Sequence, residues 1–147
     1  MEFGTLHEMW VTDGARANGA VEDAVEGRLV GLEPPERGTR FLFFTVDPDD
    51  PALDSEALEK RVARGFEAIG AAHCRPDTSR SPHMHQTRTV DYVIVLEGVV
   101  TLLLDQDEVE LKPFDVVIQR GTNHAWINKG GETALLAAVL IDAEPRA

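Results

Sequence analysis

The chain has 147 residues, 43% of them hydrophobic, and a formal net charge of −12 at pH 7. This length suits one domain with a single hydrophobic core, and the apolar fraction argues against global disorder. The negative charge disfavours nucleic acid and anionic membrane surfaces as partners, because both attract clustered Lys and Arg. A single cysteine, Cys74, excludes an internal disulfide framework.

The N-terminal quarter of the sequence predicts an arm. Residues 1–4 do not begin a secretory signal, and no apolar run reaches the roughly 20 residues that span a bilayer, so we expect a cytoplasmic protein. Residues 1 to about 38 are rich in Gly, Ala, Glu and Pro, which predicts an extended arm lying along a body formed by residues 39–147. The body starts with Arg40–Val46, whose aromatic and β-branched residues predict a strand.

One helix is predicted before the remaining strands, over about residues 55–69. Its apolar stripe, at spacings of four, four and three residues, consists of Leu58, Val62, Phe66 and Ile69. Asp54 or Ser55 is placed to cap its start, and Gly70 lies just past its end. We expect this stripe to pack on the body.

From residue 81 onward, short runs rich in Val, Ile and Leu alternate with turn residues. The predicted strands are Tyr92–Leu96, Val99–Leu104, Glu108–Leu111, Val116–Gln119, His124–Asn128 and Thr133–Ile141. Short strands with turns every eight to twelve residues are typical of an antiparallel sandwich or barrel. The fold class is therefore predicted to be all-β.

Histidines mark the candidate site. Residues two apart in an extended segment point to one face, so His83 and His85 can aim at one point, which suits a metal ion. The same alternation places Asp91, Val93 and Val95 on the histidine face. On a later strand, Trp126 and Asn128 share a face with His124. We read the remaining histidines, His7 and His73, as surface or satisfied residues, and Cys74 as a bland thiol.

Two of these segments resemble the conserved motifs of the cupin superfamily. The first, two histidines one residue apart followed by an acid and a Gly, is similar to His83, His85, Asp91 and Gly98. The second, a Gly, a His and an Asn, is similar to Gly121, His124 and Asn128. The resemblance implies a jelly-roll-like double-stranded β-helix barrel, with a metal held by His83, His85 and His124 and often by the acid.

The position of the acid departs from the family pattern. The motif acid is usually a Glu four or five residues after the second His, whereas Asp91 lies six residues after it. Asp91 is therefore either a direct ligand or a pocket residue, and Gln86 is a weaker substitute ligand. Imidazole with carboxylate suits one divalent Fe, Mn, Zn, Ni, Co or Cu ion. The predicted pocket residues are Trp126, Val93, Val95, Gln86 and Asn128.

Open coordination positions would allow such a metal to meet a substrate. The sequence thus predicts a metal-dependent enzyme acting on a small organic molecule with a chelating carbonyl, carboxylate or enol, through lyase, isomerase or dioxygenase chemistry. No catalytic residue is assigned. The alternative is a small-molecule-binding or sensing cupin without catalysis. The resemblance also implies a homodimer, and we expect the arm and the Phe41–Phe44 strand to cross to the partner, because open strand edges need covering.

Overall fold

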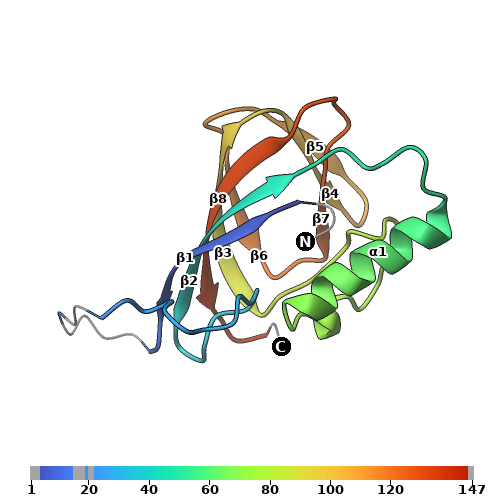
Figure 1. Ribbon diagram of the computed structural model, residues 1–147. Helices are drawn as coiled ribbons and strands as arrows, with labels where there is room; N and C mark the ends of the chain where they lie inside the picture. The colour runs from blue at the N-terminus through green and yellow to red at the C-terminus, as the bar shows by residue number, and fades with distance from the viewer. Residues whose placement is uncertain (1–3, 15–18, 20–21, 146–147) are drawn as a thin grey trace.

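The computed structural model describes residues 4–14, 19 and 22–145 (Figure 1). Residues 1–3, 15–18 and 20–21 of the predicted arm, and residues 146–147 of the predicted body, lie outside the described residues. The elements in chain order are β1 (Leu6–Thr12), β2 (Thr39–Val46), α1 (Ser55–Ala68), a 3-10 turn η1 (Ala72–Cys74), β3 (Thr89–Glu97), β4 (Val100–Leu104), β5 (Glu108–Leu111), β6 (Val116–Arg120), β7 (His124–Ile127) and β8 (Ala134–Asp142).

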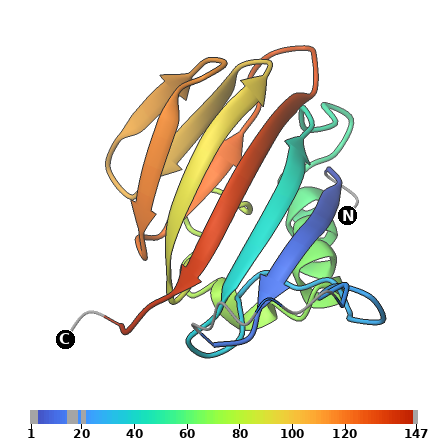
Figure 2. The same cartoon turned by 90° about the vertical axis from the view of Figure 1, so that its left-hand side faces the viewer.

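The strands form two antiparallel sheets packed face to face. The larger sheet has five strands in the order β1-β2-β8-β3-β6, seen face-on in Figure 2, and the smaller has three in the order β5-β4-β7. Buried Val, Leu and Ala side chains from both sheets meet in one core cluster that includes Leu42, Val93, Leu102 and Leu136. The described chain is thus an all-β sandwich with a single α-helix, which confirms the predicted fold class.

The predicted elements agree with the structure to within a few residues at each end. The predicted Arg40–Val46 strand begins at Thr39, and all six strands predicted after residue 81 are present. The helix starts after the predicted cap Asp54, whose carboxylate accepts a hydrogen bond of 2.8 Å from the Ala57 amide. It ends at Ala68, two residues before Gly70, which takes a left-handed φ of 68°.

The apolar stripe of helix α1 packs in a small cluster beside the sheets. Its buried residues Val62 and Phe66 form a separate apolar cluster with Ala71 and Cys74, with Leu32 packed against it. The stripe therefore packs on η1, which belongs to the predicted body, and on the segment before β2. Only the Phe66 ring reaches the histidine segment, with its centroid 5.2 Å from that of His85.

Within the described residues, no helix is long and apolar enough to cross a membrane.

Strand β1 covers the edge of β2 that was expected to meet a partner. It pairs with β2 along its length, from Leu6 opposite Phe44 to Thr12 opposite Thr39. A buried ion pair between Glu8 on β1 and Arg40 on β2 reinforces the pairing. The edge of β2 is therefore closed within the chain.

Candidate metal and ligand site

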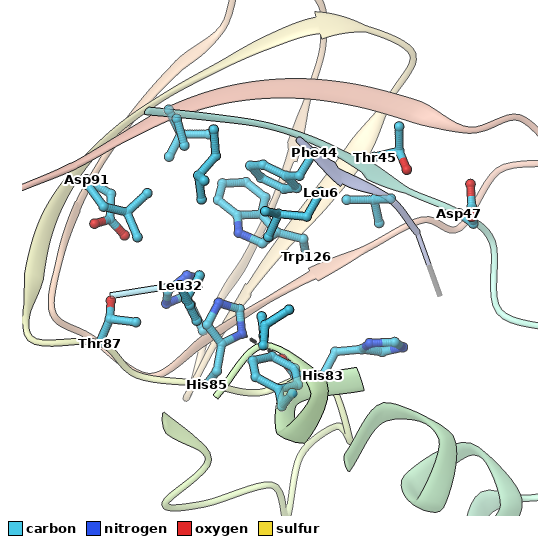
Figure 3. A pocket seen from close by; sticks show the side chains of 18 residues that line it. Leu6, Leu32, Phe44, Thr45, Asp47, His83, His85, Thr87, Asp91 and Trp126 are labelled. Atoms are coloured by element: carbon cyan, nitrogen blue, oxygen red, sulfur yellow. Dashed lines mark hydrogen bonds between the residues drawn. The ribbon is translucent and has the colours of Figure 1, made fainter. Parts of the chain in front are cut away.

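A cavity of about 100 Å³ lies between the two sheets, next to α1 (Figure 3). Its walls are mostly apolar, and its polar side chains come from β3, from β7, from the segment before β3 and from the end of β2 and the residue after it. The lining residues are Leu6, Leu32, Leu42, Phe44, Thr45, Val46, Asp47, Phe66, Ile69, His83, His85, Thr87, Asp91, Val93, His124, Trp126, Ala138 and Leu140. A mostly apolar wall with a few convergent polar groups is typical of small-molecule sites.

His85 and His124 meet because their backbones pair. The two residues form an isolated antiparallel bridge and exchange both hydrogen bonds, of 2.8 and 2.9 Å. Directly opposed residues project to the same face of a sheet. Their rings consequently lie 4.3 Å apart between centroids, with Trp126 packed edge-on to His124 at 5.9 Å. The structure thus brings together these two of the three predicted histidines.

Each of these rings is held in one tautomer. His85 Nδ1 lies 2.9 Å from the His83 carbonyl oxygen, and His124 Nδ1 lies 2.8 Å from the Thr122 carbonyl oxygen. A carbonyl only accepts, so both Nδ1 atoms carry the proton and both Nε2 atoms keep a lone pair. Burial lowers the pKa of His85 to about 3, helped by the neighbouring His124, and lowers the pKa of His124 to about 4. Both rings are therefore neutral at pH 7, the form in which imidazole binds a metal.

His83 is oriented differently from the prediction. An extended segment was assumed, but residues 81–84 form a turn, with the Met84 amide donating to the Ser81 carbonyl at 3.1 Å. Strand alternation therefore does not apply at His83. Its ring points away from His85 (Figure 3), and its Nε2 lies 2.8 Å from an Asp49 carboxylate oxygen. His83 lines the edge of the cavity rather than pairing with the other two histidines.

Asp91 lies in the cavity wall, on the face that alternation predicted. It is only 5% exposed, and its Oδ1 is buried without a hydrogen-bond partner among the described residues. Burial raises the pKa of Asp91 to about 6, although a hydrogen bond from Thr89 opposes the shift. A buried carboxylate oxygen without a partner is costly, and a cation or a donor on a ligand would satisfy it.

Two of the five residues predicted for the pocket, Val93 and Trp126, line the cavity. The other three lie outside its lining. Val95 is buried in the core. Gln86 donates to the Gly121 carbonyl at 2.7 Å, and Asn128 donates to the Val46 carbonyl at 2.9 Å, so both amides hold backbone segments together.

Most of the apolar wall was not predicted as part of the site. Phe66 and Ile69 were recognised as a helical stripe, and Phe44 as part of a strand, but nothing local indicated which cavity they would line. Leu6 and Leu32 come from the predicted arm. Thr87 was also missed, although it is two residues from His85, so the alternation that placed Asp91 could have found it.

The nitrogen and oxygen atoms that face the cavity are of the chemical types that bind a divalent metal. Two neutral imidazole nitrogens and a carboxylate oxygen without a partner are the ligand types that first-row transition metals take. Bonds from Nδ1 to backbone carbonyls are the usual outer support of metal-binding histidines. In the described part of the chain, however, no three donor atoms from the cavity histidines and Asp91 lie within 4.8 Å of one another. A third protein ligand would require a side chain to turn.

Comparisons with known sequences also find a similarity to cupins. The family described as "Cupin domain" matches residues 72–141. Phomopsin biosynthesis cluster protein C' of Diaporthe leptostromiformis is 42% identical over 64 residues, covering 42% of this chain and 34% of that protein. The cupin-domain-containing oxidoreductase srdD of Neurospora crassa is 40% identical over 58 residues, covering 39% of this chain and 30% of that protein. The chain thus matches about a third of the length of these curated relatives.

Solved cupin structures are more distant. A cupin 2 conserved barrel domain protein from Salinispora arenicola aligns with a TM-score of 0.45 and 16% identity, covering 71% of this chain and 64% of that one. The polyketide cyclase RemF from Streptomyces resistomycificus aligns with a TM-score of 0.44 and 20% identity, covering 74% and 57%. The motif residues, the two-sheet architecture and the family match agree that residues 72–141 of the chain form a cupin domain.

Proposed function

We propose that this cupin binds one divalent transition metal in its cavity and acts there on a small organic molecule. The observation that carries the proposal is the state of the two paired histidines. Both are neutral, both are fixed with Nδ1 protonated, and both present an Nε2 lone pair from the wall of one cavity. Fixed lone pairs in this arrangement suit a shared cation better than a hydrogen bond between the two rings, because neither Nε2 carries a proton to donate.

His83 and Asp91 complete the proposed ligand set. Asp91 provides the carboxylate oxygen that lacks a partner, either directly or through a bound water. His83 would join only after its ring leaves Asp49, with which it now pairs at 2.8 Å. When bound, the metal would act as a Lewis acid or hold oxygen beside a chelating substrate, and its identity among Fe, Mn, Zn, Ni, Co and Cu is left open by these ligand types.

The cavity wall indicates the substrate class. The described residues lining it include no Lys or Arg, whereas most of them are aliphatic or aromatic. A highly charged molecule such as a sugar phosphate would find no counter-charge there, so we propose an apolar or aromatic substrate with a carbonyl or enol as its polar end. The relatives named cupin-domain-containing oxidoreductases favour oxidative chemistry over the lyase and isomerase alternatives.

A second candidate is a cupin that binds such a molecule without converting it. The engagement of His83 with Asp49 favours this reading, because it leaves two paired histidines where a metal enzyme would show three. In that case Asp91 would accept a hydrogen bond from the ligand itself. We further propose that the protein acts in the cytoplasm as a homodimer. Its net charge of −12 disfavours nucleic-acid and anionic-membrane partners.

Elemental analysis of the purified protein, after loading with each candidate metal, tests the proposal. We expect His85→Gln and His124→Gln each to hold about one equivalent less metal than the parent, because one remaining imidazole binds weakly. His7→Gln, which changes an exposed histidine on β1, should keep the parental content. A parent that binds no transition metal, or variants that retain all of it, would refute the metal site. Oxygen uptake with diketones or catechols then separates oxygenase activity from binding alone.

A further inference from the structure

A second group of metal-ligand residues lies outside the cavity. Among the described residues, Glu33, His73 and Cys74 bring a carboxylate oxygen, an imidazole nitrogen and a sulfur within 4.8 Å of one another. They come from two separate parts of the chain. Glu33 belongs to the segment before β2, and His73 and Cys74 belong to η1, which follows α1. The sequence alone indicated a surface or satisfied residue for His73 and a bland thiol for Cys74, and it gave no role to Glu33.

The distances resemble those of a tetrahedral metal site. Cys74 Sγ lies 3.6 Å from His73 Nε2, and a zinc ion with bonds of about 2.3 Å to sulfur and about 2.05 Å to nitrogen sets that edge at about 3.6 Å. His73 Nε2 lies 2.7 Å from Glu33 Oε2, a hydrogen-bond distance that would have to widen by about 0.7 Å. The His73 side chain is 65% exposed and can make that adjustment, whereas Cys74 is fixed by burial.

Cys74 is unsuited to the other role that a Cys-His-Glu cluster suggests. Burial and the nearby Glu33 carboxylate raise the pKa of the Cys74 thiol to about 12, so it is not a nucleophile at neutral pH. His73 Nε2 already bonds the carboxylate and cannot serve the sulfur as a free base. A divalent cation would instead balance the carboxylate and the thiolate together, with the thiol proton released to solvent when the metal–sulfur bond forms.

We propose that Glu33, His73 and Cys74 bind a thiophilic divalent cation such as Zn²⁺, with water as the fourth ligand. Such an ion fastens the segment before β2 to the end of α1. Leu32, the neighbour of Glu33, packs against the cluster of Val62 and Phe66 and also lines the cavity. The second site therefore holds one wall of the ligand cavity in place, and it is separate from the proposed site at His85 and His124.

Cobalt absorption spectroscopy can test this site alone, because the chain has a single cysteine. A thiolate bound to Co²⁺ gives a charge-transfer band in the near ultraviolet that nitrogen and oxygen ligands do not give. We expect this band on titrating the parent with Co²⁺, and no band in Cys74→Ser. Glu33→Gln and His73→Gln should each weaken Co²⁺ binding at this site by at least about tenfold. His7→Gln, a matched change at an exposed histidine, should leave the titration unchanged.

The variant His124→Gln separates the two proposals, since it disables the cavity site and should retain the full charge-transfer band. Circular dichroism verifies the folded state of each variant, and if Cys74→Ser does not fold, Glu33→Gln and His73→Gln still decide the matter. Absence of the band at millimolar Co²⁺ in the folded parent would overturn the proposal. The proposal would also be overturned if the charge-transfer band gave the parental Co²⁺ affinity in both Glu33→Gln and His73→Gln, because Cys74 would then bind the metal without these two residues.

Discussion

At the scale of single residues, buried groups with opposite pKa shifts share one small cavity. His85 and His124 stay neutral because burial disfavours the imidazolium, and burial also favours the neutral form of Asp91. Without a metal, this wall of the cavity therefore holds little charge below pH 6 and gains one negative charge above it. A cation bound there would neutralise that charge, so metal affinity should rise as Asp91 ionises.

The pKa of Asp91 leads to a prediction about stability in the metal-free protein. Its folded pKa of about 6 exceeds the usual 3.8, so the stabilising contribution of its neutral form is complete below about pH 4 and is lost as pH rises through 6. The shift corresponds to roughly 3 kcal/mol. The difference in free energy of unfolding between Asp91→Asn and the parent should therefore shift in favour of the variant from about pH 4 to about pH 7.5, by up to that amount.

Urea unfolding in the presence of a chelator, at both pH values, measures this difference. Asp107→Asn, the same change at an exposed carboxylate between β4 and β5, provides the control. An equal effect of Asp91→Asn at the two pH values would show that its carboxyl group is not perturbed.

The sequence predicted some site residues better than others, for local reasons. Strand alternation placed Asp91 and Val93 correctly because both lie on one regular strand, β3. The same rule failed at His83, because a turn over residues 81–84 redirects its ring. Glu33 and His73 gave no signal, since their proximity depends on how the arm and α1 fold together. Contacts between distant segments are invisible to a local pattern.

At the scale of elements, the strands after residue 81 were predictable because short runs rich in Val, Ile and Leu are separated by turn residues. Strand β1 was not, because only Val11 of its seven residues is buried and its extended shape depends on pairing with β2. The end of α1 differed by one residue, which is ordinary fraying.

The turn glycines of the two cupin motifs allow a matched test. Gly98 and Gly121 both adopt left-handed φ angles, of 77° and 68°, and alanine there costs about 1–2 kcal/mol. A Cβ at Gly98 would also lie 2.9 Å from the Ala134 Cα, whereas at Gly121 the nearest atom is 3.5 Å away. We expect Gly98→Ala to lower the free energy of unfolding by about 1–3 kcal/mol more than Gly121→Ala, as measured by urea unfolding. Equal losses would mean that β3 and β8 yield around the new methyl group.

At the scale of the whole molecule, the predicted homodimer needs a surface other than the edge of β2, which β1 covers. The outer face of the large sheet offers one. Tyr92 on β3 lies opposite Ile118 on the edge strand β6, and both are about half exposed, as is the nearby Val116. Apolar side chains gathered on a sheet face in this way are typical of contact surfaces.

Sedimentation velocity tests this assembly. We expect the parent to sediment as a dimer at micromolar concentration and Ile118→Lys to sediment as a monomer, because a buried lysine without a partner is costly. Val109→Lys, a similar change on β5 of the other sheet, should remain dimeric. A parent that is monomeric at every concentration would contradict the dimer, and a dimeric Ile118→Lys would place the contact elsewhere.

The cavity wall is built from two parts of the chain, one inside and one outside the segment that matches the cupin domain. Its histidines, Asp91 and Trp126 lie within residues 72–141, the segment that matches the cupin domain, whereas Leu6, Phe44 and Phe66 precede it. The chemical groups and much of the shape that selects a ligand therefore reside in different stretches of one gene. A chimera that exchanged only the first 71 residues for those of another cupin would be expected to change what enters the cavity while leaving its reactive groups untouched. Divergence within such a family can then explore new ligands without rebuilding the centre.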